Sequence, residues 1–508
     1  MKTQGSGTKL GTIADPVQFG SMTAGAWPSR MAMLLFLLVA LFVRGAWVVY
    51  QAHDKRGPEQ LGVLSVDIGD TPSYLDPVEA LLRGEGFTPD YRMPGVAAPY
   101  YLFRQLMDSG SSRDAYVVLQ WLLSSVSVVI LAHLAWLVTG RRRVFVLVYL
   151  VFLASTFTSL YVPAIGSDSL AVSSLIIHVF LLDRAVRYKG KAHLLGAGFF
   201  LTWAIFTKPV LAPLLLLAVA LLFFRTGRAK SWTYVLWFLV PFIVIDGAWT
   251  YRNYNVNGGF HPLTNQGMFA QSFTDGVRYK AMNFVQGYGG DYIWWNPGAG
   301  IRWYGVWDKC GEIDQEGRLA APPPAYAYAP SYGPDSLLRL SNDVRLLHAR
   351  TLAPADSVGL NSSVLQRFDR YAEAYRTERP FQYHVLSRLR MTKNIFDQNG
   401  TESLFSRSFG SLPLWAKGFK LIQSFLYVFC FLFGTVGAIV LGWRWRSTHG
   451  HLVVALSTLA IYTTFIHPLG LRMCEWRYLA TAYPFMLLFA VVFVEQVATK
   501  TLGRSAKH

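Results

Sequence analysis

The chain has 508 residues, of which 52% are hydrophobic and only 15% are Asp, Glu, Lys or Arg. A soluble domain carries roughly 25% charged residues, so this composition excludes an ordinary soluble protein. The formal net charge is +17, but the basic residues gather in short loops between apolar segments, which is typical of membrane topology signals rather than of nucleic-acid binding.

Apolar segments near the ~20 residues that cross a bilayer as a helix recur along the whole chain. We therefore predict an all-α polytopic membrane protein with about ten transmembrane helices. The predicted spans are residues 31–50, 115–138, 144–162, 170–182, 194–206, 211–224, 232–249, 421–443, 452–466 and 479–497.

These spans predict the domain organisation and the orientation of the chain. The predicted parts are a flexible cytoplasmic N-terminus (1–30), a membrane domain of seven spans (31–250), an extracytoplasmic insertion (251–420), three further spans (421–498) and a cytoplasmic tail (499–508). The basic loops all fall on one side if both termini are cytoplasmic. A first outer loop (51–114), with interfacial helices, and the α or α/β insertion then lie outside. The insertion ends in a basic amphipathic segment that suits a helix at the membrane surface.

The first outer loop contains the acidic stretch VDIGDTPSYLDPVEALLRGEGF soon after span one. Asp76, followed by Pro77 and then by Glu79, predicts a helix that begins at Asp76. That helix leaves Asp67 and Asp70 unexplained, apart from a turn that Asp70 could cap. A carboxylate within hydrogen-bond reach of a hydroxyl can act as its general base. We therefore interpret one of these two residues as a catalytic base.

Basic residues in short outer loops run against the positive-inside bias and invite an explanation. Arginine offers a planar fork of donors that matches a phosphate, and lysine offers a point charge. Several of them at one depth suit a lipid-linked phosphate, although each could also snorkel to headgroups or pair with an acid such as Glu475. These residues are Lys208, Arg252, Arg472 and Arg477. Asp168, between spans three and four, either caps the next helix or faces the same cavity. His261 could hydrogen-bond a ligand or simply the backbone.

Four stretches, in this order, resemble bacterial GT-C glycosyltransferases such as the protein O-mannosyltransferases and the lipid A aminoarabinose transferase. They are GDTPSYLDPVEALLRGEGF and YRMPGVAAPYYLF after span one, RNYNVNGGFHPLTNQG after span seven, and EWRYLATAYPFMLLFA at the last span. The resemblance implies a GT-C-like fold in a bacterial inner (plasma) membrane and a sugar donor carried on polyprenyl phosphate. It implies that Asp70 is the base, with Asp67 second, and that Asp168 is the second-loop acid.

The same resemblance, taken with the outer cations, gives the candidates for substrate binding. They are Lys208, Arg252, Asn253, His261, Arg472, Arg477, Tyr478, Tyr74 and Arg92. The chain departs from the family in RMPGVAAPYY and in having no adjacent Asp-Glu pair after span one, which argues against close kinship with the protein mannosyltransferases.

We therefore predict an inverting glycosyltransferase that moves a sugar to a hydroxyl of a lipid, glycan or protein on the outer face of the membrane. The outer cations would stabilise the leaving phosphate, so no cofactor is required, although Asp67, Asp70 and Asp168 could hold a divalent cation. Three alternatives stay open: a lipid or solute transporter, an oligosaccharide ligase or polymerase that uses a lipid pyrophosphate, and a non-catalytic scaffold. The absence of sequence repeats and of charges at the span centres disfavours the transporter.

Overall fold

The computed structural model describes residues 29–57, 61–88, 92–226, 228–263, 273–293, 299–306, 321–349, 353–397, 399–443 and 450–505. Within these ranges there are isolated bridges but no β-strands, so the prediction of an all-helical fold is confirmed there. Residues 1–28 of the predicted N-terminus and 506–508 of the predicted tail lie outside the described residues.

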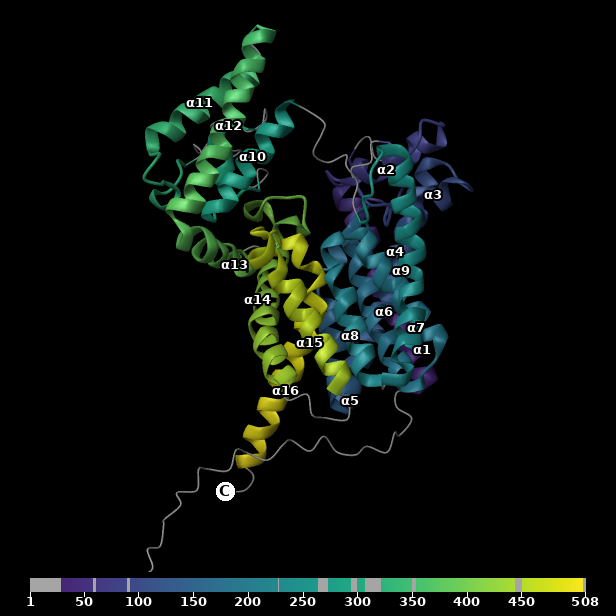
Figure 1. Cartoon of the computed structure of the whole chain (residues 1–508). Helices are drawn as coiled ribbons and strands as arrows, with labels where there is room; N and C mark the ends of the chain where they lie inside the picture. The colour runs from purple at the N-terminus through teal and green to yellow at the C-terminus, as the bar shows by residue number, and fades with distance from the viewer. Residues whose placement is uncertain are drawn as a thin grey trace, which may run out of the picture.

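The α-helices carry the labels of Figure 1. They are α1 (Arg30–Lys55), α2 (Thr71–Leu82), α3 (Ala97–Arg104), α4 (Ser109–Thr139), α5 (Arg142–Ala154), α6 (Ser167–Tyr188), α7 (Lys191–Thr207), α8 (Pro213–Thr226), α9 (Arg228–Asn257), α10 (Phe273–Tyr288), α11 (Pro334–Ala349), α12 (Pro354–Glu378), α13 (Ser387–Asp397), α14 (Leu414–Trp443), α15 (Gly450–Phe465) and α16 (Tyr483–Ser505).

Every predicted span overlaps one of these helices. Among the described residues, six helical stretches are long and apolar enough to cross a membrane, and they correspond to α1, α4, α6, α9, α14 and α15 with the turn that follows it. Two shorter apolar helices, at Pro209–Phe224 and Tyr483–Thr499, accompany them. The six helices indicate an integral membrane protein, and the count of ten spans stays a prediction.

The insertion and the first loop lie at the same end of the helix bundle (Figure 1). Helices α10 to α12 lie above the ends of α14 to α16, and α13 packs against the bundle beneath them, whereas α2 and α3 lie over the ends of α4 and α9. We call this end of the molecule the insertion end. The described part of the insertion is helical and has its own aromatic core, which includes Phe284, Tyr304 and Phe368.

Close approach of backbones holds the bundle together. A Cβ atom at Gly434 of α14 would lie 2.3 Å from the carbonyl oxygen of Met486 in α16, and one at Gly198 of α7 would lie 2.0 Å from that of Phe238 in α9. Small residues at helix contacts are the usual means by which membrane helices pack, because lipid provides no hydrophobic drive between them.

The buried Arg44 of α1 joins that helix to α5. Its guanidinium donates to the carbonyl oxygens of Phe152 at 2.8 Å and Ser155 at 3.3 Å. Phe152 lies in the last turn of α5 and Ser155 is its C-cap residue, where carbonyl groups have no partner within the helix. Arg44 therefore fixes where α5 ends and where the loop toward Asp168 begins.

Candidate active site

The first loop is tied to the bundle before it reaches Asp70. The carboxylate of Asp114, in α4, accepts hydrogen bonds from the backbone N–H groups of Val63, Leu64 and Ser65 at 2.8–3.2 Å. Val66 then pairs in parallel with Ala164, in the segment between α5 and α6. The loop is thereby brought beside the start of α6, where Asp168 lies.

Helix α2 begins at Thr71, so the predicted start at Asp76 and Pro77 is wrong. Pro72, in the first turn, needs no helical partner for its missing N–H and favours a start at this position. The Thr71 hydroxyl accepts from the N–H of Ile68 and donates to the carbonyl oxygen of Ile165, both at 2.9 Å, which fixes the turn against the α5–α6 segment. Pro77 is accommodated inside the helix.

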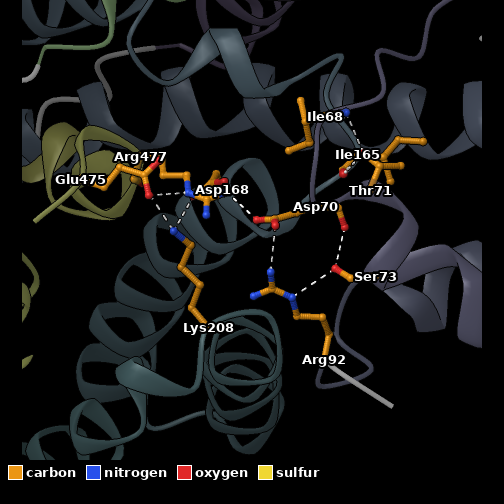
Figure 2. Close-up of polar contacts among 10 residues, drawn as sticks. All are labelled: Ile68, Asp70, Thr71, Ser73, Arg92, Ile165, Asp168, Lys208, Glu475 and Arg477. Carbon is orange, nitrogen blue, oxygen red and sulfur yellow. Dashed lines mark hydrogen bonds and ion pairs between the residues drawn. The ribbon is translucent and has the colours of Figure 1, made fainter. Parts of the chain in front are cut away.

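Asp70 occupies the N-cap position of α2 but its side chain makes no capping hydrogen bond. Its carboxylate instead contacts two arginines (Figure 2): Oδ1 lies 3.0 Å from Nη2 of Arg92, and Oδ2 lies 2.5 Å from Nη1 of Arg477. Burial alone would raise the pKa of Asp70, but Arg477 and Arg92 outweigh burial and lower that pKa below its ordinary value. Asp70 is therefore ionised at neutral pH.

Arg92 is positioned by contacts on both sides. Its Nε donates to the hydroxyl of Ser73 at 3.2 Å, and its guanidinium carbon lies 5.1 Å from the centre of the Tyr74 ring. Three residues further on, Gly95 meets the end of α7, and a Cβ atom there would lie 2.4 Å from the carbonyl carbon of Phe206. Only glycine permits this approach, which places Arg92 close to the segment that carries Lys208.

Lys208 and Asp168 form a buried ion pair beside Asp70 (Figure 2). The ammonium group of Lys208 also donates to the carbonyl oxygen of Arg477 at 3.4 Å. The side chains of Lys208 and Asp168 are 9% and 5% exposed, whereas that of Asp70 is 27% exposed. Asp70 is thus the more accessible carboxylate, and Asp168 holds Lys208 in place.

Glu475 completes the group, with its Oε2 atom 2.9 Å from Nε of Arg477. Burial raises the pKa of Glu475 to about 7, against the opposing effect of Arg477. The sequence had suggested Glu475 only as an acid that would neutralise an outer arginine, and its place inside the site is new. Tyr478 lies beside this group, because its ring centre is 5.8 Å from Nζ of Lys208 and 5.5 Å from the guanidinium carbon of Arg477. On its other contact it stacks on His467, with 4.8 Å between the ring centres and 12° between the planes.

The structure therefore brings together six charged side chains that lie far apart in the sequence. These are Asp70, Arg92, Asp168, Lys208, Glu475 and Arg477. Three carboxylates face three cations, and one carboxylate has a pKa near neutrality. Such a group can accept a singly charged anion if Glu475 takes up a proton, because the net charge then stays close to zero.

Other predicted site residues lie elsewhere. Asp67 pairs with Arg113, with 2.6 Å between Oδ2 and Nη1. Arg252 lines a cavity of about 530 Å³, where its guanidinium carbon lies 4.9 Å from the Trp249 ring centre and its Nη2 donates to the carbonyl oxygen of Phe87 at 2.9 Å.

The remaining predicted residues are Asn253, His261 and Arg472. Asn253 donates to the backbone carbonyl of His261 at 3.0 Å, so both support the end of α9. Arg472 stacks on Tyr383 of the insertion. No contact between described residues joins Arg252 or Arg472 directly to Asp70.

The suggested cation site at Asp67, Asp70 and Asp168 finds no support in this arrangement. Each carboxylate faces a basic side chain: Asp67 faces Arg113, Asp168 faces Lys208, and Asp70 faces Arg92 and Arg477. Within the described residues, no group of three or more His, Cys, Asp or Glu side chains is arranged to hold a metal ion.

Comparisons with known proteins gave matches in structure. No protein-family model and no curated protein sequence matches the chain. The chain is similar to the archaeal oligosaccharyltransferase AglB from Archaeoglobus fulgidus in complex with an inhibitory peptide and a dolichol-phosphate, with a TM-score of 0.42 and 12% identity over 95% of this chain and 52% of AglB. It thus spans about half the length of that protein.

A second similar structure is ArnT from Cupriavidus metallidurans bound to undecaprenyl phosphate. The TM-score is 0.34 and the identity 14%, over 92% of this chain and 78% of ArnT. Both similar structures are membrane glycosyltransferases of the GT-C fold, the family that the sequence motifs of this chain resemble.

Proposed function

We propose that the chain is an inverting glycosyltransferase that moves a sugar from a polyprenyl-phosphate donor to an acceptor hydroxyl. The observation that carries this proposal is the accessible carboxylate of Asp70, held between Arg92 and Arg477 at the insertion end of the bundle. Asp70 is a potential base, and the two arginines are potential hydrogen-bond donors to a phosphate. The acceptor hydroxyl and the donor phosphate have to meet at such a point for transfer to occur.

The donor phosphate would bind to the two arginines. Guanidinium groups match a phosphate through paired hydrogen bonds, and Arg92 and Arg477 are 30% and 22% exposed, so both are reachable. Lys208 is paired with Asp168 and would add positive electrostatic potential at the phosphate without contacting it directly. The polyprenyl chain would leave the site along the apolar helix surfaces, where burial of each CH₂ group contributes about 0.8 kcal/mol.

In the reaction, Asp70 would take the proton of the acceptor hydroxyl. The acceptor oxygen would form a bond to the anomeric carbon as the bond between that carbon and the phosphate oxygen breaks. The phosphate leaves with the bonding electrons, and attack from the opposite face inverts the anomeric centre. Fixed cations at the leaving oxygen are worth about 100- to 1000-fold each in rate, by analogy with the loss of one oxyanion donor.

The resting contacts of Asp70 suit this sequence of events. With both arginines bound to it, Asp70 is a weak base, because their charges lower its pKa. A donor phosphate that draws Arg92 and Arg477 toward itself would neutralise part of that charge and raise the pKa again. The base would therefore become stronger only when the donor is in place.

The predicted orientation puts this site on the outer face of a bacterial plasma membrane, with both termini in the cytoplasm. The distribution of basic loops supports it. Arg141, between α4 and α5, and Arg143, in the first turn of α5, pair with Glu495 of α16. The start of α5 lies at the end of the bundle opposite the insertion (Figure 1).

Transfer assays with defined donors test the proposal. Purified protein in proteoliposomes would be given radiolabelled sugars on polyprenyl monophosphate or on polyprenyl pyrophosphate, with envelope lipids, glycans and peptides as acceptors. We expect transfer from the monophosphate donor. Transfer from the pyrophosphate donor alone would make the chain a ligase or polymerase, and transport of either lipid without transfer would contradict an enzymatic role.

A further inference from the structure

Two arginines from different parts of the chain, Arg388 and Arg472, lie near Tyr383 and away from the Asp70 site. The guanidinium carbon of Arg472 lies 3.5 Å from the centre of the Tyr383 ring. Arg388, in α13, donates to the carbonyl oxygen of Gly470 at 3.4 Å. Arg388 and Tyr383 come from the end of the insertion, and Arg472 from the turn before α16, so the pair joins the insertion to the bundle.

The two cations are close enough for the charge of Arg472 to act on Arg388, and neither is paired with an acid in the part of the chain that the structure describes. No ion pair between described residues includes Arg388 or Arg472. Burial and the neighbouring charge of Arg472 lower the pKa of Arg388, which is the expected effect of two like charges held together. An arrangement of this kind is stabilised when an anion binds between the two guanidinium groups.

The backbone geometry holds the pair in place. Arg472 has a φ of 52°, in the left-handed region that a residue with a side chain rarely adopts. It ends a π-helical turn, Ile466–Leu471, and Tyr383 lies in a second π-helical turn, Gln382–Leu386. π-Helical turns are rare and occur often at functional sites.

The position of α13 along the bundle corresponds to a membrane surface. The hydroxyl of Tyr427, in α14, donates to the carbonyl oxygen of Ile395 in α13 at 2.7 Å. Exposed apolar side chains occur along the whole of α14, from Leu414 to Trp443. The span predicted within it, residues 421–443, is about 33 Å long at 1.5 Å per residue. This is close to the ~30 Å hydrocarbon thickness. Tyr427 lies six residues, or about 9 Å, inside the insertion end of this stretch, so the end of α13 that carries Ile395 lies within about 9 Å of the boundary between hydrocarbon and headgroups.

The continuous helical segment of residues 380–397, which contains the π-helical turn and α13, also exposes apolar side chains. Phe381, Val385 and Leu389 are 62%, 39% and 55% exposed, and they follow one another at intervals of four residues, which places them along one side of the helix. Apolar side chains next to arginines at this depth are typical of a helix that lies in the membrane interface.

We propose that Arg388 and Arg472 bind the phosphate of a lipid in the leaflet at the insertion end, while Phe381, Val385 and Leu389 enter the acyl region beside it. The ligand is a phosphate-bearing lipid, and bound lipid anchors the insertion over the bundle. The inference does not depend on glycosyl transfer, because it involves none of the six charged residues around Asp70.

Lipid binding to the purified full chain in detergent, followed by native mass spectrometry, tests the proposal. The probes are dioleoyl phosphatidylglycerol, dioleoylglycerol and inorganic phosphate. We expect phosphatidylglycerol to bind to the native chain, and R388Q/R472Q to bind it at least tenfold more weakly. The control R370Q/R376Q removes the same charge from α12 and should bind as the native chain does. Equal binding of dioleoylglycerol, stronger binding of inorganic phosphate than of the lipid, or equal loss in both double variants would overturn the proposal.

A second measurement tests the placement of α13 in the membrane interface, and it does not require the double variant to fold. A spin label at Leu389→Cys, in lipid nanodiscs, should be accessible to oxygen and shielded from a water-soluble nickel chelate. The control is Val358→Cys, whose native side chain is 62% exposed and lies in the first turns of α12, the end of that helix further along the chain from α13. Equal accessibility of both labels to the nickel chelate would refute the placement of α13 in the membrane interface.

Discussion

The replacement Glu475→Gln tests how the site accepts an anion. Glu475 has a pKa of about 7, raised by burial, and contacts Arg477. At that pKa, about nine tenths of Glu475 is protonated at pH 6 and about one tenth at pH 8. A neutral Glu475 leaves Arg477 available for the donor phosphate. A charged Glu475 competes for Arg477 and repels the phosphate. Binding should therefore be tighter at low pH.

The expected size follows from the protonated fraction. If the neutral form of Glu475 binds the donor, the affinity of the native chain falls about tenfold from pH 6 to pH 8, or about 1.4 kcal/mol. Asp70 stays ionised throughout, because its pKa is lowered. Glu475→Gln should bind as tightly at pH 8 as the native chain does at pH 6, with no dependence on pH.

Equilibrium binding of a polyprenyl phosphodiester sugar, measured in detergent between pH 6 and pH 8, checks this expectation. The phosphodiester does not titrate in that range, so a slope belongs to the protein. Glu79→Gln is a matched control. Glu79 is also paired with an arginine, Arg104, but both residues belong to the first outer loop and lie outside the site. A flat profile for the native chain, or a slope that persists in Glu475→Gln, would refute the reasoning.

Three further replacements probe the contacts around Asp70. Arg477→Lys should lower transfer about 100-fold, because an ammonium group cannot contact Asp70 and Glu475 together as the guanidinium does; activity within threefold of native would contradict this. Lys208→Met leaves Asp168 buried and unpaired and should cost about 3–5 kcal/mol of unfolding free energy. Adding Asp168→Asn should recover most of that loss in a chemical denaturation experiment, and an additive loss would argue against the pair. Asp114→Ala removes the acceptor for three backbone N–H groups and should destabilise the loop by about 2 kcal/mol. Hydrogen exchange of Val63 to Ser65 should accelerate, with α4 itself unchanged, and unchanged exchange in the loop would rule out the anchoring role.

The gathering of charged residues at one end of the bundle could be predicted from the sequence. Apolar runs indicate where helices enter and leave a bilayer, so Asp70, Asp168, Lys208 and Arg477 were all expected outside the spans on one side of the membrane. The structure indeed brings these four together. Their catalytic and binding roles stay predictions, because geometry alone does not test them.

The lateral position of each residue around the bundle could not be predicted in the same way. Arg252 and Arg472 follow spans at the same end, yet Arg252 stacks on Trp249 and Arg472 on Tyr383. The contacts of Arg252 and Arg472 depend on which helices are neighbours in the bundle, and hydropathy carries no information on that. The burial of Glu475 likewise follows from tertiary packing, and its raised pKa has no signal in the sequence.

Local chemistry was misleading at the start of α2. Asp76 and Pro77 have the pattern of a helix start, but Thr71 and Pro72 provide an earlier start that is fixed to Ile165 by a hydrogen bond. The long-range contact decides between the two, and it also frees the Asp70 side chain from capping.

Transfer by Asp70→Asn tests the central claim most directly. The matched control is Asp76→Asn, an exposed aspartate six residues further along the same loop. Donor binding and transfer from the monophosphate donor would be measured for both variants in proteoliposomes. The account predicts that Asp70→Asn still binds the donor but loses transfer by at least about 100-fold, while Asp76→Asn remains as active as the native chain. Transfer by Asp70→Asn at the native rate would contradict the role of Asp70 as the base.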